Sequence, residues 1–512
     1  MSQERSTAHR QELQRSWRGW LAVLCAAGSM FASRAVGAQD DVAGKVRALT
    51  EAMSRVEAQL QESQRQLDEM RRQLSELQGG KTTEANRAAA DGSQEAGEDA
   101  AKLAAQVEEL RERQAMQETQ IAVHDQAKVE SASKYPVKLS GLVLMSGFVN
   151  TRGVDMPATP TLAVAGAGST GATARQTILG VNLRGPHVFG AESHGDVRVD
   201  FDGSTPVGTG YGGGYGVDLL RLRTAHASLD WEHTEAFFAL DRPITSANWP
   251  DSLTAVAEPP LAWSGNLWSW NPQFGVTQDL GWGGVSRLRA QAAVVDVGDA
   301  PYTSSLVVLG GATQIESTAE ASRWPGAEAR IAMLGGSAEN GVQVGVGGLY
   351  APHRSIGGTR FDSWAGTMDV KLPLPAHMAL SGAFYRGQAL GGLGGGAYKD
   401  YVYRVYEGRP YFRALDDVGG WGQWKQKVSE RLEFNEAVGI DNVPAGELEP
   451  YAGTTTSVFQ NITRNRTAMG NVIYSPSAYL LFSLEYRRIS SSAVNLGTTE
   501  SDVIGVGAGY KF

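Results

Sequence analysis

The feature that most constrains this chain is a series of short runs, between Val137 and Phe512, in which apolar residues alternate with other residues. A period of two is typical of β-strands, because successive side chains point to opposite faces. Most runs are close to the length of about 9–11 residues that a tilted membrane strand needs. The pattern predicts sixteen strands, at residues 137–150, 174–184, 194–203, 219–231, 235–242, 273–281, 284–297, 327–335, 341–351, 361–373, 377–388, 417–427, 430–441, 466–475, 478–489 and 501–512.

The gaps between these strands tend to alternate between long and short. Bacterial outer-membrane barrels have long extracellular loops and short periplasmic turns, so both ends of the strand region are expected on the periplasmic side. No apolar run of 18 residues occurs in this region, and only helices and closed barrels satisfy every backbone group in lipid. The sequence therefore predicts an all-β transmembrane barrel of about 16 antiparallel strands. The long gaps are 151–173, 204–218, 243–272, 298–326, 389–416 and 442–465.

The last predicted strand has the composition expected of the strand that closes a barrel. One face carries glycines and Lys511, whereas the other face is apolar and ends in aromatic residues. Aromatic side chains at the edge of an apolar band are typical of outer-membrane barrels. The face predicted to contact lipid consists of Ile504, Val506, Ala508, Tyr510 and Phe512.

Residues 1–38 have the composition of a secretion signal. Arg15 and Arg18 precede an apolar stretch that begins at Trp20, and Val36–Ala38 forms a small-residue cleavage site. An uncleaved inner-membrane anchor is the alternative. Such an anchor needs about 20 apolar residues, whereas this stretch is shorter and is interrupted by polar residues. Cleavage is therefore the preferred interpretation.

The only cysteine, Cys25, lies inside this predicted signal. Cys25 as a lipidation site is a further alternative, but Leu24 precedes it where a small residue is expected. The processed chain would then have no thiol for a disulfide, a zinc site or catalysis.

A heptad pattern occupies residues 42–77. Apolar residues recur at spacings of four and three, with Ser63 the single exception, and Gln, Glu and Arg fill the other positions. This pattern predicts a periplasmic α-helical coiled coil. A helix lying on its own barrel is the alternative, although the apolar stripe is narrow for that packing. Residues 79–100 are small and polar and are predicted to be a linker, 101–134 a weakly helical segment, and 135–512 the barrel.

Short runs along the strand region occur in an order that resembles the DcaP-like family of trimeric outer-membrane porins. They are Arg175–Gly180 (RQTILG), Val197–Gly203 (VRVDFDG), Leu220–Ala225 (LRLRTA), Ser264–Trp268 (SGNLW), Pro272–Phe274 (PQF), Glu433–Asn435 (EFN), Gly439–Asp441 (GID) and Leu484–Arg487 (LEYR). The resemblance covers nearly the whole barrel region, and the coiled coil fits the family's N-terminal arrangement.

The resemblance implies a homotrimer in the outer membrane and a preference for small anionic solutes, including dicarboxylates. The chain departs from the family at Asp241-Arg242, where Gly-Gln is expected. It also has Trp270 where the family tends to place a basic residue. Both departures lie near the expected constriction, so the solute preference is the implication that they affect most.

Arginines alternate with apolar residues on three of the predicted strands. On the lipid face near the bilayer midplane, each arginine would cost about 2–4 kcal/mol, so these side chains are expected to line the lumen. There they would form a ladder that binds anions, opposite acidic residues such as Asp200, Asp202 and Glu485. The alternative is that these charges only solvate the wall and pair with one another. The ladder residues are Arg198, Arg221, Arg223, Arg287 and Arg289.

The third long gap, 243–272, is rich in tryptophan and proline. This composition favours a packed loop, and in sixteen-stranded porins the loop at this position folds into the barrel and narrows it. An external loop packed on its neighbours is the alternative. The predicted constriction residues are Trp249, Trp263, Trp268 and Trp270.

The sequence contains no catalytic, metal-binding or cofactor motif in a supporting context. Gly208-x-Gly210-x-x-Gly213 matches a dinucleotide pattern, but no helix follows it, and the eight histidines lack metal-ligand spacing. The net charge of −9 argues against nucleic-acid binding. We therefore expect no enzyme and no cofactor, but passive diffusion of small hydrophilic solutes. A structural barrel whose coiled coil tethers the outer membrane to the cell wall is the alternative function.

Overall fold

A computed structural model describes residues 136–203, 219–282, 286–301, 316–336, 341–355, 357–407, 409–452 and 458–512. The predicted signal at 1–38, the coiled coil at 42–77, the linker at 79–100 and the helical segment at 101–134 lie outside the described residues. These four assignments stay predictions, as does the cell-wall tether that depends on the coiled coil.

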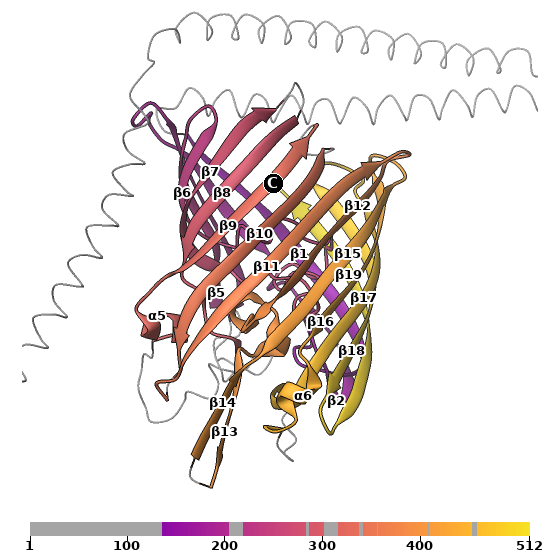
Figure 1. The fold of residues 1–512 in the computed structure, drawn as a ribbon. Helices are drawn as coiled ribbons and strands as arrows, with labels where there is room; N and C mark the ends of the chain where they lie inside the picture. Colours follow the sequence, from indigo (N-terminus) through magenta and orange to yellow (C-terminus); the bar gives the residue numbers. More distant parts are fainter. Residues whose placement is uncertain are drawn as a thin grey trace, which may run out of the picture. The chain divides into compact units, whose positions relative to one another are not determined.

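The described residues form one antiparallel sheet of 17 strands that closes on itself (Figure 1). Closure is made by β1 and β19, which pair from Leu142 with Lys511 to Asn150 with Val503. The strands of the sheet are β1 (Val137–Val154), β2 (Ala163–Thr173), β3 (Ile178–Arg184), β4 (Glu192–Gly203), β5 (Leu219–Asp230), β6 (Thr234–Asp241), β7 (Asn271–Trp282), β8 (Ser286–Val295), β9 (Gly326–Gly335), β10 (Val342–Arg354), β11 (Arg360–Leu374), β12 (Met378–Gln388), β15 (Asp416–Lys427), β16 (Leu432–Asn442), β17 (Ile462–Tyr474), β18 (Leu480–Ala493) and β19 (Gly497–Lys511).

Strands β2 and β3 occupy a single position in the wall. β3 pairs with the first part of β1, up to Leu142, and β2 pairs with the later part, from Ser146 onward. The break between them is held by Thr177, whose Oγ1 accepts a hydrogen bond from the Leu144 backbone N–H at 3.0 Å. The barrel therefore has sixteen strand positions, and the sequence-based prediction of a closed sixteen-stranded barrel is confirmed.

The structure corrects the predicted strands in two places. The gap predicted at 151–173 contains strand β2, so only residues 155–162 connect β1 to β2. The gap predicted at 389–416 contains a hairpin of two further strands, β13 (Tyr401–Tyr406) and β14 (Arg409–Ala414). Both segments were assigned to loops because their small or mixed side chains do not alternate clearly between apolar and polar residues.

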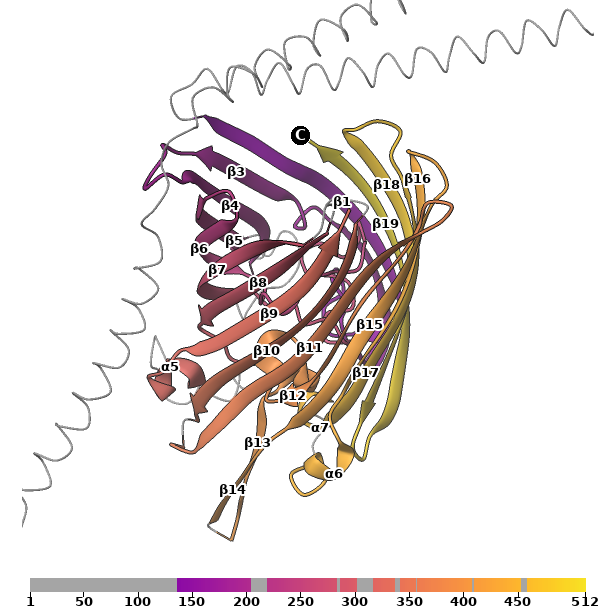
Figure 2. The same ribbon diagram turned by 45° about the horizontal axis from the view of Figure 1, so that its top comes forward.

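The two ends of the barrel differ. The start of β1 and the C-terminus lie at one end, and the β13–β14 hairpin projects from the other end (Figures 1 and 2). Two connections at the hairpin end, 355–359 and 494–496, are short because β10 and β18 extend further than predicted. The helices of the described residues all lie in connections: α5 (Thr318–Ser322), η1 (Gly391–Leu393), η2 (Gly396–Tyr398), α6 (Ala445–Leu448) and α7 (Val458–Asn461).

No helix among the described residues is long and apolar enough to cross a membrane.

Side chains alternate between the two faces of the wall as the period of two predicts. On β19, Ile504 and Val506 are 44% and 50% exposed on the outer face, whereas Val503, on the inner face, is buried. The predicted apolar outer face of the closing strand is therefore correct. The same alternation on the other strands gives the barrel an apolar outer band, which is the surface that lipid solvates best.

Candidate functional site: the barrel lumen

The connection between β6 and β7, residues 242–270, folds back into the barrel, and we call it the lumen loop. The hydroxyl of Thr245 donates a hydrogen bond to Glu328 on β9 at 3.3 Å. Further along, the hydroxyl of Thr254 donates to Glu485 on β18 at 2.8 Å. Both carboxylates are on the inner face of the wall, and many strands separate them around the barrel. The lumen loop therefore crosses the lumen rather than packing on external loops.

Gln176, in the break between β2 and β3, holds the middle of the lumen loop. Its side-chain oxygen accepts hydrogen bonds from the backbone N–H groups of Val256 at 2.7 Å and Ala257 at 3.1 Å. Its amide nitrogen donates to the Thr254 carbonyl at 3.0 Å. Gln176 is fully buried, and buried polar groups need such partners. The interruption of this strand position thus supplies the anchor for the loop.

Two of the predicted arginines clamp the same segment of the loop. Arg221, on β5, donates two hydrogen bonds to Asp200, its register partner on β4, at 3.0 and 2.7 Å. Arg223 donates to the same carboxylate at 2.8 Å. Each guanidinium also donates to the loop backbone at 2.9 Å, Arg221 to the Ala257 carbonyl and Arg223 to the Val256 carbonyl. The two arginines therefore hold the loop in place and also put positive charge on the inner wall.

Trp270, at the end of the lumen loop, covers both guanidinium groups. The ring centroid lies 5.2 Å from the Arg221 guanidinium carbon and 4.8 Å from that of Arg223. Cation–π contacts at this range stabilise by about 0.5–2 kcal/mol. The aromatic residue that departs from the family pattern thus touches the arginine pair directly.

Three further charged groups surround Arg221. Asp202 lies 3.9 Å from the Arg221 guanidinium and 3.8 Å from that of Arg175. Glu258, from the lumen loop, lies 3.8 Å from Arg221. We call Arg175, Arg221, Arg223, Asp200, Asp202 and Glu258 the arginine–acid cluster. With every group ionised, its three cations balance its three anions.

Glu258 is the group in this cluster whose charge is most sensitive to its surroundings. Burial raises the pKa of its carboxyl to about 8, and the nearby Arg221 opposes that shift only in part. Its Oε2 atom has no hydrogen-bond partner among the described residues. Glu258 is therefore mostly protonated at neutral pH, which leaves the cluster with a net positive charge.

The other three predicted arginines also lie on the inner face but do not join this cluster. Arg198 donates to the Asn182 side chain at 2.7 Å and lies 3.5 Å from Asp196. Arg289 and Arg287 share Asp279, at 2.7 and 3.4 Å. The five arginines thus form three separate groups on the inner face, each with an acidic partner.

Of the three acidic residues expected opposite the arginines, Glu485 has a different role. It accepts hydrogen bonds from Ser252 and Thr254 of the lumen loop and lies 2.9 Å from Arg487 on its own strand. Asp200 and Asp202 do meet Arg221, as predicted from their strand positions.

The first part of a second connection, residues 389–400 after β12, also enters the barrel. The buried Lys399 ammonium donates to the backbone carbonyls of Ala397 at 2.9 Å and Ile462 at 2.7 Å. Asp417 accepts from the Gly396 backbone N–H at 2.7 Å. Asp441 accepts from the Ala397 N–H at 2.8 Å and from the Tyr385 hydroxyl at 2.6 Å. These bonds fix the connection against the inner wall towards the hairpin end.

The four predicted constriction tryptophans have different environments. Trp263 stacks on Tyr398 with ring centroids 4.4 Å apart, and Trp268 meets Trp263 edge-on at 5.9 Å, both inside the main buried apolar cluster. Trp249 instead lies under the Arg242 guanidinium at 4.6 Å. Only Trp270 touches the arginine–acid cluster, so the other three position the loop.

Sequence reasoning missed Arg175, Glu258 and the buried segment 389–400. Arg175 lies within the run 174–184 that was assigned to a strand, whereas β3 begins at Ile178, and Glu258 is the acidic residue before Pro259-Pro260 in the lumen loop. The sequence signal in the segment 389–400 is its high glycine content. A Cβ on Gly392 would lie 1.9 Å from the Gly298 carbonyl oxygen. Its glycines thus permit close backbone packing rather than a solvated loop.

Comparisons with known proteins agree with this geometry. The DcaP outer membrane channel of Acinetobacter baumannii superposes with a TM-score of 0.54 at 18% identity, covering 75% of this chain and 99% of the channel. The fold is that of a porin. An anion-selective porin from Comamonas acidovorans gives a TM-score of 0.48 at 11% identity, covering 74% of this chain and all of the porin.

No protein-family model and no curated protein matches the chain. The structural similarity to the DcaP channel supports, at the level of the fold, the resemblance to DcaP-like porins that the sequence suggested.

Proposed function

We propose that the chain forms an outer-membrane porin, as a homotrimer, through which small hydrophilic solutes diffuse passively. The observation that carries this proposal is a closed barrel, apolar outside, whose lumen is crossed by a loop clamped to a charged inner wall. Such a loop narrows a barrel without sealing it by a separate plug domain, and the charges it holds determine which ions pass.

We further propose a preference for small anions, carboxylates in particular. The carboxylate of Asp200 is fully buried and that of Asp202 is 10% exposed, whereas the side chains of Arg175 and Arg221 are each 23% exposed. A solute in the lumen thus meets guanidinium groups before it meets the carboxylates behind them. Guanidinium offers paired donors that match a carboxylate. Protonation of Glu258 adds to the positive balance.

Osmotic swelling of proteoliposomes tests both parts of this proposal. The solutes are a four-carbon dicarboxylate, a four-carbon polyol and a four-carbon diamine, which differ mainly in charge. We expect the dicarboxylate to enter fastest and the diamine slowest. The variant with Arg175→Ala and Arg221→Ala is expected to lose this order, whereas Arg386→Ala, on the outer face, keeps it.

Vesicles that do not swell with any of the three solutes would contradict the pore itself. Equal rates for the dicarboxylate and the diamine would contradict the anion preference and leave the pore standing.

A further inference from the structure

The outer face of the barrel changes from apolar to charged at one level on the strands from β10 to β19. On β18 the outward residues are apolar from Leu480 to Tyr486 and polar from Arg488 onward. On β17 the change comes between Ala468 and Arg466. The outward residues at this level are Arg354, Asp362, Arg386, Asp416, Asn442, Arg464, Arg466, Arg488, Glu500 and Asp502. In a membrane, this level is the head-group boundary nearest the long loops.

Most of the charges at this boundary are paired. Arg386 lies 3.2 Å from Asp416, and Arg488 lies 2.6 Å from Glu500 and 3.3 Å from Asp502. In contrast, no described residue pairs with Arg464 or Arg466, and the Arg464 Nε–H is buried without a partner. Arg354, on β10, also has no partner among the described residues, but at this level two such guanidinium groups lie on one strand only on β17, so positive charge concentrates there.

An apolar groove of about 920 Å³ runs along the outer face from these arginines towards the end of the barrel where the C-terminus lies. Its floor is formed by small residues, Gly420 and Gly422 on β15 and Ala468 on β17. Its walls include Phe384 and Val438, which are 52% and 61% exposed. Its end nearest the hairpin is lined by Arg466, by Arg488 and by Glu500, which pairs with Arg488.

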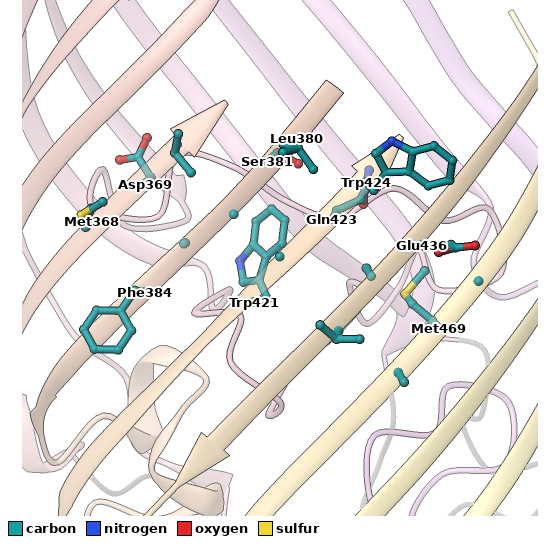
Figure 3. A pocket seen from close by; sticks show the side chains of 18 of the residues that line it. Met368, Asp369, Leu380, Ser381, Phe384, Trp421, Gln423, Trp424, Glu436 and Met469 are labelled. Atoms are coloured by element: carbon teal, nitrogen blue, oxygen red, sulfur yellow. The ribbon is translucent and has the colours of Figure 1, made fainter. Parts of the chain in front are cut away.

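A second groove, of about 820 Å³, continues from the first towards the end of the barrel where the C-terminus lies, and shares Phe384, Gly422, Val438 and Ala468 with it (Figure 3). It also contains Glu436, an outward carboxylate beside Trp424. The carboxylate is at the far end from the arginines, so the combined groove is apolar along its length, positive at the hairpin end and negative towards the end with the C-terminus.

We propose that this groove binds an acylated lipid that carries phosphate on its head group. The acyl chains would lie over the glycines and the phosphate would meet Arg464 and Arg466. Guanidinium groups bind phosphate through paired charged hydrogen bonds, and basic clusters at a membrane boundary are typical of recognition of anionic lipids. Glu436 repels phosphate from the end of the groove that is far from the arginines, and this repulsion fixes the direction in which the lipid lies.

This inference rests on the barrel lying in an outer membrane, and not on which solutes pass through its lumen. Native mass spectrometry of the purified full chain can test it with two probes, diphosphoryl lipid A and the same lipid with both phosphates removed. Replacing Arg464 and Arg466 by Gln should weaken binding of the diphosphoryl probe about tenfold. Binding of the dephosphorylated probe should not change.

The matched control removes two arginines at the same level outside the groove, Arg354→Gln with Arg386→Gln, and should bind both probes as the unmodified chain does. Gly422→Leu should weaken both probes, because a Cβ at Gly422 meets no atom within 4 Å and the new side chain fills the groove without a clash.

Equal binding of the two probes by the unmodified chain would overturn phosphate recognition, as would an equal loss in the control pair. If lipid binding is unchanged and the oligomer dissociates in the Arg464→Gln, Arg466→Gln variant, the groove is instead a contact between copies of this chain. Single-channel conductance should be the same in every variant, so a failure here is distinct from a failure of the proposed pore.

Discussion

Replacing Asp200 by asparagine should increase the preference of the pore for anions. Asp200 is fully buried and accepts three hydrogen bonds from Arg221 and Arg223. Asparagine has nearly the same shape and keeps one acceptor oxygen in place of two, and the bonds from Gln176 and from the two arginines to the loop backbone still hold the lumen loop. The substitution thus removes one negative charge from the arginine–acid cluster while disturbing the path of the loop as little as possible.

The size of the effect follows from distance and screening. A solute that touches the lumen side of Arg221 lies about 8 Å from the Asp200 carboxylate, where two unit charges interact by about 2 kcal/mol at an effective dielectric constant near 20. Physiological salt has a screening length of about 8 Å and reduces this energy to below about 1 kcal/mol. Chloride permeability should therefore rise about fourfold and potassium permeability should fall about fourfold, so the ratio of the two should rise by roughly tenfold.

Reversal potentials of the Asp200→Asn variant in planar bilayers measure this ratio. The matched control is Asp416→Asn, which removes the same charge from the outer face beside Arg386 and should leave the ratio unchanged. An unchanged ratio in the Asp200→Asn variant, or a shift towards potassium, would refute the placement of this cluster beside the path of the solute.

Three further predictions follow from the lumen loop and the domain division. Because burial raises the pKa of Glu258 to about 8, the chloride preference should fall as pH rises from 7 to 9; recordings of Glu258→Gln, which stays neutral, should show no such fall. Trp270→Ala removes the ring over Arg221 and Arg223 and should give larger and noisier single-channel currents, whereas Trp249→Ala should not. Deleting residues 42–77 should leave conductance unchanged and weaken trimer cohesion, as measured by native mass spectrometry; a truncated chain that fails to insert would show that the segment belongs to the folding unit of the pore.

The architecture could be predicted from the sequence because each strand position depends on local alternation. Outward residues such as Ile504 and Val506 are apolar and exposed, and the inward Gly505 and Gly507 pack under the lumen loop, so the period of two is visible along the chain. Strand β2, Ala163–Thr173, lacks this signal because its residues are mostly Ala, Gly, Ser and Thr. The composition of β2 does not reveal that it pairs with β1.

The lumen could be predicted only in part. Alternation places Arg221 and Arg223 on the inner face, but it does not reveal that Asp200 holds both of them. Nor does it show that the Val256 and Ala257 carbonyls accept from them, because those contacts depend on where a 29-residue loop turns inside the barrel. The burial of Glu258, which raises its pKa, depends on the same path of the loop. Trp270 lies at the end of the lumen loop, and its contact with the arginine pair was not foreseen.

The reversal potential of the unmodified protein in a potassium chloride gradient tests the central claim most directly. The arginine–acid cluster presents Arg175 and Arg221 to the lumen and keeps Asp200 and Asp202 behind them, so the potential should have the sign of a chloride-selective pore at pH 7. The variant with Arg221→Ala and Arg223→Ala should move it towards zero. A cation-selective potential, or one that this variant leaves unchanged, would contradict the account.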